Sequence, residues 1–553
     1  MTKKNPDFFL KIGFAALFVL QFIGIVYINL FRNGHRIGFD AGIAFSNAIE
    51  IWEQGTLNPV FLREFSNLHF DTAMPFAALL YGITGDIFLS FGIVNIIFSA
   101  LIAVAFAILL KDITNTNTLE NREGIRANNT LAIIVPMCIL FSSFVSRGCY
   151  LNNSLDNFYS LIFTSAAFWG FRLLTGLCCI KAFLVFYEKK SGTASIIWAT
   201  IATAAVFICA VSTGFYILVT FIAPLILFFG VKALTGSASV KELLKNKAVY
   251  LVILWVFVTL VGRFVAGSVF DFRPNDTPVL TGAADFFSNL QSVYLGYLIL
   301  LGGIRHVTYV PVASRSGLFF LSNIFIAHLL IAAVVLTLSR IKKKAALSDG
   351  ALIFLSVIFV NLVIFTLTFL TYGATVFETR YLIPVVVALI ALLGGVISYE
   401  GKTARVRHAL LGCLLAALII SNLFSFSTYI GTTIYDQREL AQKISGFEAG
   451  LVYTPNKIVT GNLRVLDTDR VFHTVQFDED SFLGVSRGRV GGYLHYIEPG
   501  SFAGDILLLA HPDDFEKLPP EIREKFTFEQ YTGFRGWNMY SAAGNYDFTF
   551  PTA

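Results

Sequence analysis

Long apolar runs recur along most of this chain and constrain its fold more than any other feature. Eleven runs approach the roughly 20 residues that an α-helix needs to cross the hydrocarbon core of a bilayer. With 56% hydrophobic and 14% charged residues over 553 positions, the chain is far more apolar than a soluble globular protein requires. We therefore predict a polytopic α-helical membrane protein. Its crossings lie near residues 9–31, 86–110, 129–146, 156–175, 193–211, 214–233, 248–268, 317–339, 351–372, 381–399 and 409–430.

The basic residues predict how these crossings are oriented. Lys and Arg gather in alternate short loops, and the loops between them are poor in both. Because cytoplasmic loops carry the excess of Lys and Arg, we expect a cytoplasmic N-terminus. Eleven crossings then put the C-terminal region outside the plasma (inner) membrane. Only Met1 to Asp7 precede the first run, and no small-residue cleavage site accompanies it, so we expect a retained helix rather than a signal peptide.

The segment 156–190 is too long for one helix and too short for two helices with a loop. Arg172 and Lys181 interrupt its apolar residues. Two crossings here would reverse the orientation of everything downstream and put the basic cluster 342–344 outside. We therefore predict one crossing, followed by a helix that lies in the cytoplasmic interface with both cations snorkelling.

Two external loops, 32–85 and 269–316, are long enough to cover a site. In the first loop, residues 41–52 have apolar side chains at helical spacing, with Glu50 and Glu53 on the other side. Residues 74–81 indicate a short apolar helix on the membrane. In the second loop, residues 289–303 are too few to span the bilayer, which favours a re-entrant or interfacial helix.

The periodicity changes from about residue 436. Residues 451–454, 470–475 and 505–509 are predicted strands, 512–525 a helix, and 526–531 with 537–540 a final strand pair. These elements indicate a small extracytoplasmic α/β domain over 436–553, after a transmembrane domain over 1–435.

Two acids at external helix ends are candidate catalytic residues. Asp40 follows the first crossing by about ten residues, and Asp156 opens the fourth. Either carboxylate could simply cap the helix that it precedes. An ionisable group near membrane depth is also a functional candidate by default, and two carboxylates can divide the roles of general base and acceptor positioning. The pair is equally compatible with a divalent metal such as Mg²⁺ or Mn²⁺.

Several further residues at external helix ends could bind a phosphate. Glu378-Thr379-Arg380-Tyr381 opens the tenth crossing, as an interfacial ion pair with an aromatic anchor or as an Arg that holds phosphate. Arg geometry suits phosphate better than Lys. Snorkelling to lipid head groups is the competing interpretation for each of the remaining cations. These are Arg263, Arg305, His306 and Arg315.

The stretch Ala510-His511-Pro512-Asp513-Asp514 resembles the zinc motif of deacetylases that act on N-acetylglucosaminyl lipids. That motif needs another His downstream, and this chain has none after His511. We therefore interpret the stretch as a loop that caps a helix after a strand.

Taken together, the layout resembles the GT-C glycosyltransferase superfamily. The features that carry the resemblance are the early Asp40 before an amphipathic helix, Asp156, the Arg380-Tyr381 helix start and the C-terminal domain. The nearest branch is the bacterial one similar to protein mannosyltransferases and lipid A aminoarabinose transferases. The Asp-Glu typical of the mannosyltransferases is replaced by Asp40-Ala41, and the Asp-x-Asp of oligosaccharyltransferases is missing, which leaves the single-Asp type.

The resemblance implies a polyprenyl-phosphate sugar as donor and an inverting transfer to a glycan, lipid or protein outside the membrane. Asp40 would accept the proton of the attacking hydroxyl, and Asp156 would orient the acceptor or bind a metal. Arg380, with Arg305 or Arg315, would stabilise the phosphate leaving group. The C-terminal domain would shape the acceptor side. Apart from these substrates we expect membrane lipids, and no nucleic acid, as partners.

Three other functions remain open on the sequence. A flippase of lipid-linked sugars should show internal repeats and acids at mid-membrane depth, whereas this chain has acids at outer helix ends. A cell-wall or O-antigen polymerase usually has one large Arg-rich external loop, and the Arg residues here are scattered. An inactive scaffold would tolerate loss of Asp40 or Asp156.

Overall fold

The computed structural model describes most of the chain as two compact units. The described residues are 6–35, 37, 39–57, 68–116, 129–144, 158–188, 192–270, 279–280, 285–303, 311, 313–342, 347–369, 379–398, 404–430, 437–485 and 504–543. The helical unit comprises Met1–Tyr27, Ser66–Ala73 and Val94–Tyr429. The mixed unit comprises Ile28–Phe65, Met74–Ile93 and Ile430–Ala553.

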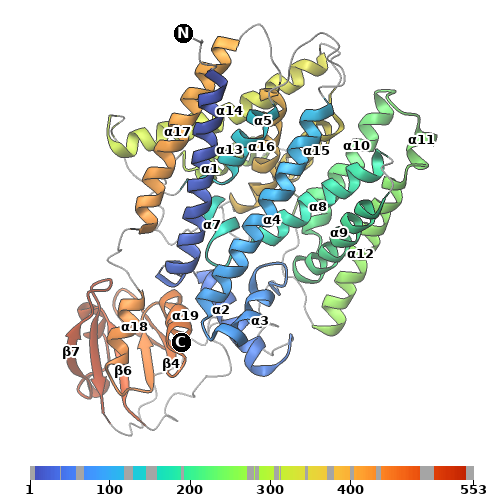
Figure 1. The fold of residues 1–553 in the computed structure, drawn as a ribbon. Helices are drawn as coiled ribbons and strands as arrows, with labels where there is room; N and C mark the ends of the chain where they lie inside the picture. Colours follow the sequence, from blue (N-terminus) through green and yellow to red (C-terminus); the bar gives the residue numbers. More distant parts are fainter. Residues whose placement is uncertain are drawn as a thin grey trace. The chain divides into compact units, whose positions relative to one another are not determined.

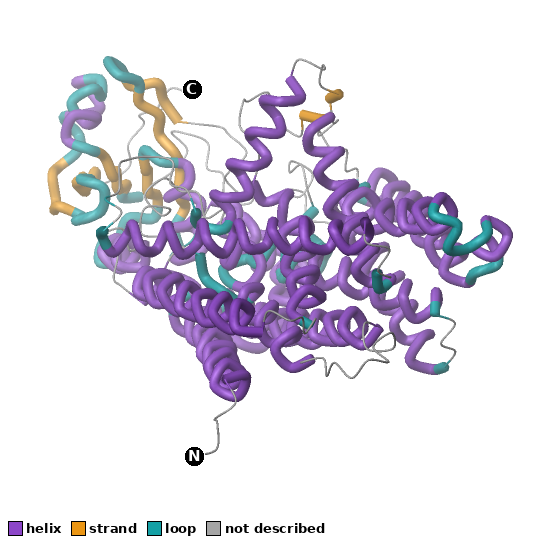
Figure 2. Tube along the Cα trace, turned by 90° about the horizontal axis from the view of Figure 1, so that it is seen from above, coloured by secondary structure: helices purple, strands orange, loops and turns teal. Residues whose placement is uncertain are grey.

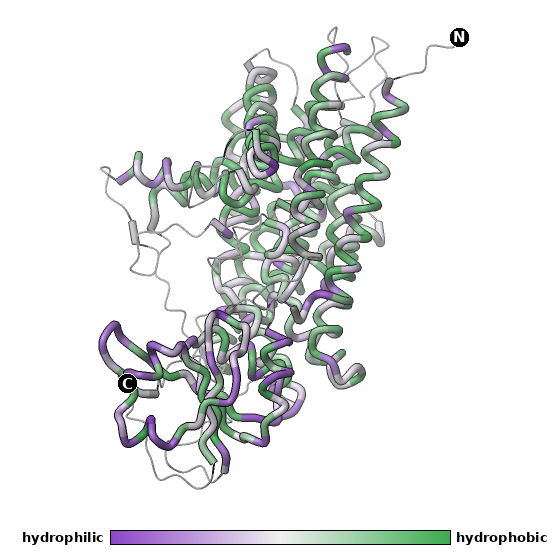
Figure 3. Tube along the Cα trace, turned by 90° about the vertical axis from the view of Figure 1, so that its left-hand side faces the viewer, coloured by the Kyte–Doolittle hydropathy of each residue, from purple (hydrophilic) through white to green (hydrophobic). Residues whose placement is uncertain are grey.

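The helical unit is built from long apolar helices, which Figure 1 shows as coiled ribbons and Figure 3 as tubes of largely hydrophobic residues. Its elements are α1 (Pro6–Phe31), α4 (Ile87–Thr116), α5 (Asn129–Leu140), α7 (Phe158–Phe163), α8 (Gly170–Tyr187), α9 (Thr193–Thr213), η3 (Leu218–Ile222), α10 (Ala223–Leu234), α11 (Val240–Leu244), α12 (Lys247–Val269), β1 (Val279–Leu280), α13 (Phe286–Leu300), α14 (Arg315–Lys342), α15 (Asp349–Leu367), β2 (Thr368–Phe369), η5 (Thr379–Leu382), α16 (Ile383–Ile397) and α17 (Ala404–Ile430). The last turn of α1 and the first two turns of α4 belong to the mixed unit.

Nine helices in the described part of the chain are long and apolar enough to cross a membrane. Eight of them coincide with predicted crossings, which confirms a multi-pass membrane protein. Two further predicted crossings form shorter apolar helices: α5 has 12 residues with Pro136 inside it, and the stretch Leu218–Leu234 begins as a π-helical turn. The most apolar helix, α16, is buried on almost every side, as expected for a helix without a polar face.

The prediction for the segment 156–190 is wrong. The described helix α7 ends at Phe163, and the ninth long helix is α8, which is mostly buried rather than interfacial. Its two cations do not snorkel. Arg172 pairs with Asp71 at 2.7 Å, and Lys181 pairs with Asp112 at 2.6 Å. Because each charge meets a carboxylate, α8 can pack inside the unit.

The mixed unit has a six-stranded sheet with helices, and Figure 2 shows its strands in orange. Its elements are η1 (Asn33–His35), α2 (Phe39–Gln54), α3 (Met74–Thr84), α18 (Gln437–Ser445), β3 (Leu451–Thr454), α19 (Lys457–Leu466), β4 (Val471–Phe477), β5 (Phe482–Val485), β6 (Ile506–Ala510), α20 (Pro512–Phe515), α21 (Pro520–Arg523), β7 (Thr527–Tyr531) and β8 (Asn538–Ala542).

The strand order is β5-β4-β3-β6-β8-β7, and β3 runs parallel to both of its neighbours while the other pairs are antiparallel. Every predicted strand is present, and the predicted helix over 512–525 is two short helices, α20 and α21. One face of the sheet packs against α18 and α19 through Leu440, Val459 and Leu463. The other face is covered by a second apolar cluster around Leu508 and Tyr540. The predicted α/β architecture is confirmed.

The amphipathic helix predicted at 41–52 and the short apolar helix predicted at 74–81 form as α2 and α3, which pack together. One detail of α2 differs from the prediction. Glu53 is exposed, but Glu50 is only 7% exposed because α2 packs against α19 of the same unit. The sequence pattern indicates that one face of α2 is solvated, but the burial of Glu50 shows that part of that polar face is covered.

Candidate functional site

A fully buried carboxylate in the first long loop marks a polar site inside the helical unit. Asp71 precedes α3 and is 0% exposed. Arg172, in the first turn of α8, donates from Nε to Oδ2 at 2.7 Å and from Nη2 to Oδ1 at 3.0 Å. This is the bidentate geometry in which a guanidinium binds a carboxylate most specifically. The pair therefore fixes loop residues 68–73 on α8.

Two hydroxyls at the end of α9 complete the coordination of Asp71. Ser212 donates to Oδ1 and Thr213 donates to Oδ2, both at 2.7 Å. The carboxylate thus accepts four hydrogen bonds, which is its full capacity. A carboxylate held in this way has both oxygens engaged by donors of the protein, so neither is free to contact a substrate. Asp71 therefore serves to position the loop rather than to act as a base.

Three aromatic side chains, Trp169, Tyr216 and Tyr381, lie beside this ion pair and form an aromatic wall. The Arg172 guanidinium lies 5.0 Å from the centre of the Trp169 ring and 5.9 Å from that of Tyr216. Tyr381 approaches the same two rings, with centroid distances of 5.7 Å to Trp169 and 6.5 Å to Tyr216. The predicted Arg380-Tyr381 helix start is therefore brought together with a buried cation from a distant part of the chain.

A second predicted cation lies at the turn that follows α9. Arg263 of α12 packs beside Gly214, whose φ of +68° allows the tight turn between Thr213 and Tyr216. Its guanidinium carbon lies 6.0 Å from the centre of the Phe215 ring. Nη1 of Arg263 is buried and makes no hydrogen bond within the described part of the chain. A buried guanidinium nitrogen without an acceptor is a candidate contact for an anionic ligand.

The other predicted site residues fall elsewhere or outside the described set. Arg315 is the exposed first residue of α14, and Arg380 is half-buried in η5. Asp40 is the second residue of α2, in the mixed unit, and its side chain is not among those described. The predictions for Asp156, Arg305, His306 and Glu378 lie outside the described residues.

The start of α2, which bears Asp40, is anchored on α19. Nδ2 of Asn462 donates to the Ile37 carbonyl at 2.8 Å. A Cβ at Gly42 would lie 2.2 Å from Oδ1 of Asn462, so glycine is required for this close approach. Both contacts lie within three residues of Asp40. The C-terminal part of the mixed unit thus fixes the backbone of the candidate base.

Farther along α2, Glu50 faces Arg464 of α19. Burial, assisted by the nearby charge of Glu53 and opposed by Arg464, raises the pKa of Glu50 to about 7. Oε2 of Glu50 is buried and has no hydrogen-bond partner among the described residues. Burial lowers the pKa of Arg464 to about 10, because its desolvation outweighs the attraction of Glu50. The α2–α19 contact therefore contains an acid that titrates near neutral pH.

No cluster of three His, Cys, Asp or Glu side chains that could hold a metal occurs among the described residues. The Mg²⁺ or Mn²⁺ site considered for Asp40 and Asp156 depends on side chains outside that set and stays a prediction. The capping interpretation of His511 is confirmed, because it is the N-cap of α20 and its Nδ1 accepts from the Asp513 amide at 3.4 Å.

Comparison with known proteins identifies the fold. No protein-family model matches the chain, and no curated protein matches it either. Among solved structures, ArnT from Cupriavidus metallidurans bound to undecaprenyl phosphate superposes with a TM-score of 0.53 over 96% of this chain and 98% of that chain, at 11% identity. The apo form of the same protein covers the same shares with a TM-score of 0.49 at 12% identity.

This chain has the fold of ArnT. The architecture that the sequence led us to expect, many membrane helices followed by a small C-terminal sheet region, is therefore confirmed. The likeness covers both the membrane helices and the C-terminal sheet region, since it extends over 96% of the chain.

Sequence reasoning missed the polar core of the helical unit. Neither Asp71 nor the hydroxyls of Ser212 and Thr213 stood out, because each is an ordinary residue of a loop or helix end. Only Arg172 could have indicated this polar core from the sequence. A cation inside a long apolar run must find an anionic partner or water, and Asp71 is an acid of the long loop after the first helix.

Proposed function

We propose that this protein is an integral-membrane glycosyltransferase that moves a sugar from a polyprenyl-phosphate-linked donor to an extracytoplasmic acceptor. The observation that carries the proposal is the GT-C-like fold shared with ArnT, a protein whose structure was solved with undecaprenyl phosphate bound. The nine long apolar helices of the described part of the chain support a membrane-embedded protein, which is where a polyprenyl-phosphate donor resides. The acceptor is a cell-envelope glycan, lipid or protein.

In this proposal Asp40 is the general base. A sugar hydroxyl is a weak nucleophile, and positioned proton transfer to a carboxylate accelerates its attack by on the order of 10²–10⁴-fold. The hydroxyl oxygen forms a bond to the anomeric carbon as the bond to the phosphate oxygen breaks, so the configuration inverts. Asn462 and Gly42 support this role, since they hold the first turn of α2.

The leaving phosphate is stabilised by cations. Arg263 is the best-supported candidate, because its buried Nη1 has no acceptor among the described residues. Arg380 is a second candidate, because it directly precedes Tyr381, whose ring belongs to the aromatic wall. Arg172 is excluded from this role, since Asp71 already neutralises it in a bidentate pair. Asp156, Arg305 and Arg315 complete the proposed set as acceptor-orienting and phosphate-binding residues.

The proposal is tested with purified protein in proteoliposomes and a panel of polyprenyl-phosphate sugars. We expect wild type to consume a donor and Asp40→Asn to lose at least 100-fold in rate, in line with removal of a general base. Arg263→Gln should lower the rate and weaken donor binding, because neutral Gln cannot compensate the phosphate charge. Equal rates for wild type and Asp40→Asn would reduce Asp40 to a helix cap.

A further inference from the structure

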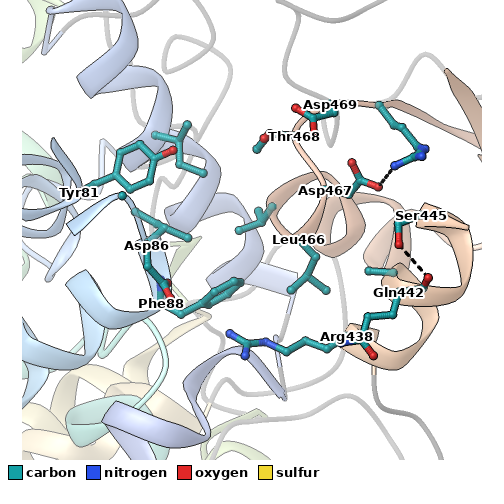
Figure 4. A pocket seen from close by; sticks show the side chains of 16 residues that line it. Tyr81, Asp86, Phe88, Arg438, Gln442, Ser445, Leu466, Asp467, Thr468 and Asp469 are labelled. Carbon is teal, nitrogen blue, oxygen red and sulfur yellow. Dashed lines mark hydrogen bonds and ion pairs between the residues drawn. The ribbon is translucent and has the colours of Figure 1, made fainter. Parts of the chain in front are cut away.

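A cavity of about 560 Å³ opens within the mixed unit (Figure 4). Ile49 of α2, Tyr81 of α3 and the start of α4 form one side, and α18, α19 and the turn that follows α19 form the other. Its volume falls within the range of small-molecule binding sites in proteins. None of its lining residues belongs to the predicted catalytic or phosphate-binding set.

The base of this cavity is apolar and rigid. Phe88, Ala441 and Val465 are buried, and the guanidinium carbon of Arg438 lies 4.9 Å from the centre of the Phe88 ring. An apolar surface of this kind supports the less polar face of a flat ligand. Arg438 itself also lines the cavity.

The turn after α19 is held in place by an internal ion pair. Arg470 binds Asp467 at 2.5 Å and also donates to the carbonyls of Ala449 and Phe447 at 2.9 and 2.8 Å. These contacts neutralise both charges and immobilise the turn. The neighbouring side chains of Thr468 and Asp469 are exposed at the cavity and are presented by a fixed backbone.

Two carboxylates without a cationic partner then remain at the cavity. Asp469 makes no ion pair with any described residue. Asp86 caps α4, with Oδ1 accepting from the amides of Phe88 and Leu89 at 2.8 and 3.1 Å, and no described residue donates to Oδ2. Figure 4 shows Tyr81 and Asp86 on one side and Gln442 on the other. The rim thus offers carboxylate, phenol, amide and hydroxyl groups around an apolar base.

We infer that this cavity binds a sugar unit of a glycan acceptor. Sugar rings present neighbouring hydroxyls, which donate well to carboxylate oxygens and accept from amide and hydroxyl donors, and a less polar face that packs on apolar side chains. A phosphate or other anion is disfavoured by Asp86 and Asp469. A lipid chain is disfavoured by the polar rim, because it would leave those groups without partners.

The cavity lies along α2 at a distance from Asp40. The sugar that it binds is therefore a unit of the acceptor far from the reacting hydroxyl. Ile49 follows Asp40 by nine residues on the same helix, which separates them by about 14 Å at 1.5 Å per residue. The cavity therefore holds a unit remote from the reacting hydroxyl. Given the proposed function, on which this step rests, the acceptor is an oligosaccharide rather than a single sugar or a protein side chain.

Direct binding tests the inference without any enzymatic activity. The full-length protein in detergent is mixed with soluble di- to hexasaccharide fragments of cell-envelope glycans, and contacts are detected by saturation-transfer NMR. We expect wild type to bind at least one fragment. Asp469→Asn with Gln442→Ala should weaken binding by about tenfold, the effect of removing two hydrogen bonds. Ser445→Trp, which fills the cavity, should abolish it.

A matched control separates this effect from loss of folding. Asp480→Asn removes an exposed carboxylate of the same unit, in the turn between β4 and β5 and away from the cavity lining, and should bind like wild type. If no fragment binds, or if Ser445→Trp binds as well as wild type, the inference is overturned. The same holds if the protein binds a control peptide or lipid micelles at this cavity instead.

Transfer kinetics distinguish failure of this inference from failure of the proposed function. With a donor that wild type consumes, the Asp469→Asn/Gln442→Ala variant should raise KM for a long acceptor several-fold, with the smaller effect on kcat expected of a contact remote from the reacting atoms. An unaltered KM in a variant that has lost fragment binding would overturn the acceptor assignment while leaving glycosyl transfer intact. Absence of donor consumption by wild type would count against the proposed function alone.

Discussion

At the scale of single residues, the partners of a buried charged group determine whether it only stabilises the fold or can also titrate. Arg172 and Asp71 are both buried inside the helical unit, and the Asp71 carboxylate accepts two hydrogen bonds from Arg172 and one each from Ser212 and Thr213. Glu50 is also buried, but its Oε2 has no donor among the residues that the structure describes. The first arrangement fixes an ionised pair, and the second makes a carboxyl group that protonates near neutral pH.

Breaking the Asp71–Arg172 pair should destabilise the protein strongly. Asp71→Leu or Arg172→Met leaves the other charge buried alone, at a cost of about 3–5 kcal/mol. The double variant Asp71→Leu/Arg172→Met removes both charges and should recover much of that loss. Thermal unfolding in detergent measures the three free energies. Additive losses in the double variant would mean that the two residues act independently.

Glu50 should make stability depend on pH. Its pKa is raised in the folded protein, so burial costs nothing below the unfolded pKa of 4.5, and stability is lost as pH rises through about 7. Glu50→Gln should therefore gain about 2–3 kcal/mol over wild type at pH 8 and little at pH 4.5. Unfolding midpoints across this range measure the difference. The exposed Glu524→Gln serves as control, and a pH-independent gap between wild type and Glu50→Gln would contradict the assignment.

At the scale of elements, α2 is the link between the candidate base and the C-terminal part of the chain. Its helical period was readable from the sequence, because apolar residues recur at the right spacing. Its partner was not, since Asn462 and Arg464 lie more than 400 residues away and neither has a recognisable motif. Similarly, the residues of α8 were predicted to lie partly in an interfacial helix, because Arg172 and Lys181 were interpreted without their partners Asp71 and Asp112.

The close contact between α2 and α19 predicts a compensating pair of substitutions. Gly42→Ala places a methyl group against Oδ1 of Asn462 and should displace the start of α2, which lowers transfer activity. Asn462→Ala leaves the buried Ile37 carbonyl without its donor, at about 1–3 kcal/mol. The double variant has room for the new methyl and should regain activity relative to Gly42→Ala.

The control for this pair is Gly412→Ala, because a Cβ at that helical position meets no atom within 4 Å. It should behave like wild type in both transfer rate and unfolding. If the double variant is less active than Gly42→Ala alone, then Asn462 does not position the first turn of α2 through this contact.

At the scale of the whole molecule, the sequence was sufficient for the class of protein and for most of its helices. Length and apolarity identify a membrane helix without tertiary information, which is why eight crossings were predicted correctly. The strands of the mixed unit followed from alternation and turn residues. The polar core around Asp71 required contacts between distant segments, so composition and spacing could not reveal it.

The predicted orientation is testable with single cysteines. Asp480 and Lys241 are both exposed, in the β4–β5 turn and in α11 respectively. We expect Asp480→Cys to react with a membrane-impermeant maleimide in intact cells, and Lys241→Cys to react only after permeabilisation. The reverse pattern would place the C-terminal part in the cytoplasm and exclude an extracytoplasmic acceptor.

The most direct test of the proposed function is to follow the donor lipid itself. Wild-type protein in proteoliposomes is supplied with labelled polyprenyl-phosphate sugars and a cell-envelope glycan acceptor. The proposal predicts release of free polyprenyl phosphate, together with the sugar on the acceptor in inverted anomeric configuration. Intact donor that merely crosses the bilayer, with no polyprenyl phosphate released from any sugar in the panel, would contradict it and indicate a flippase.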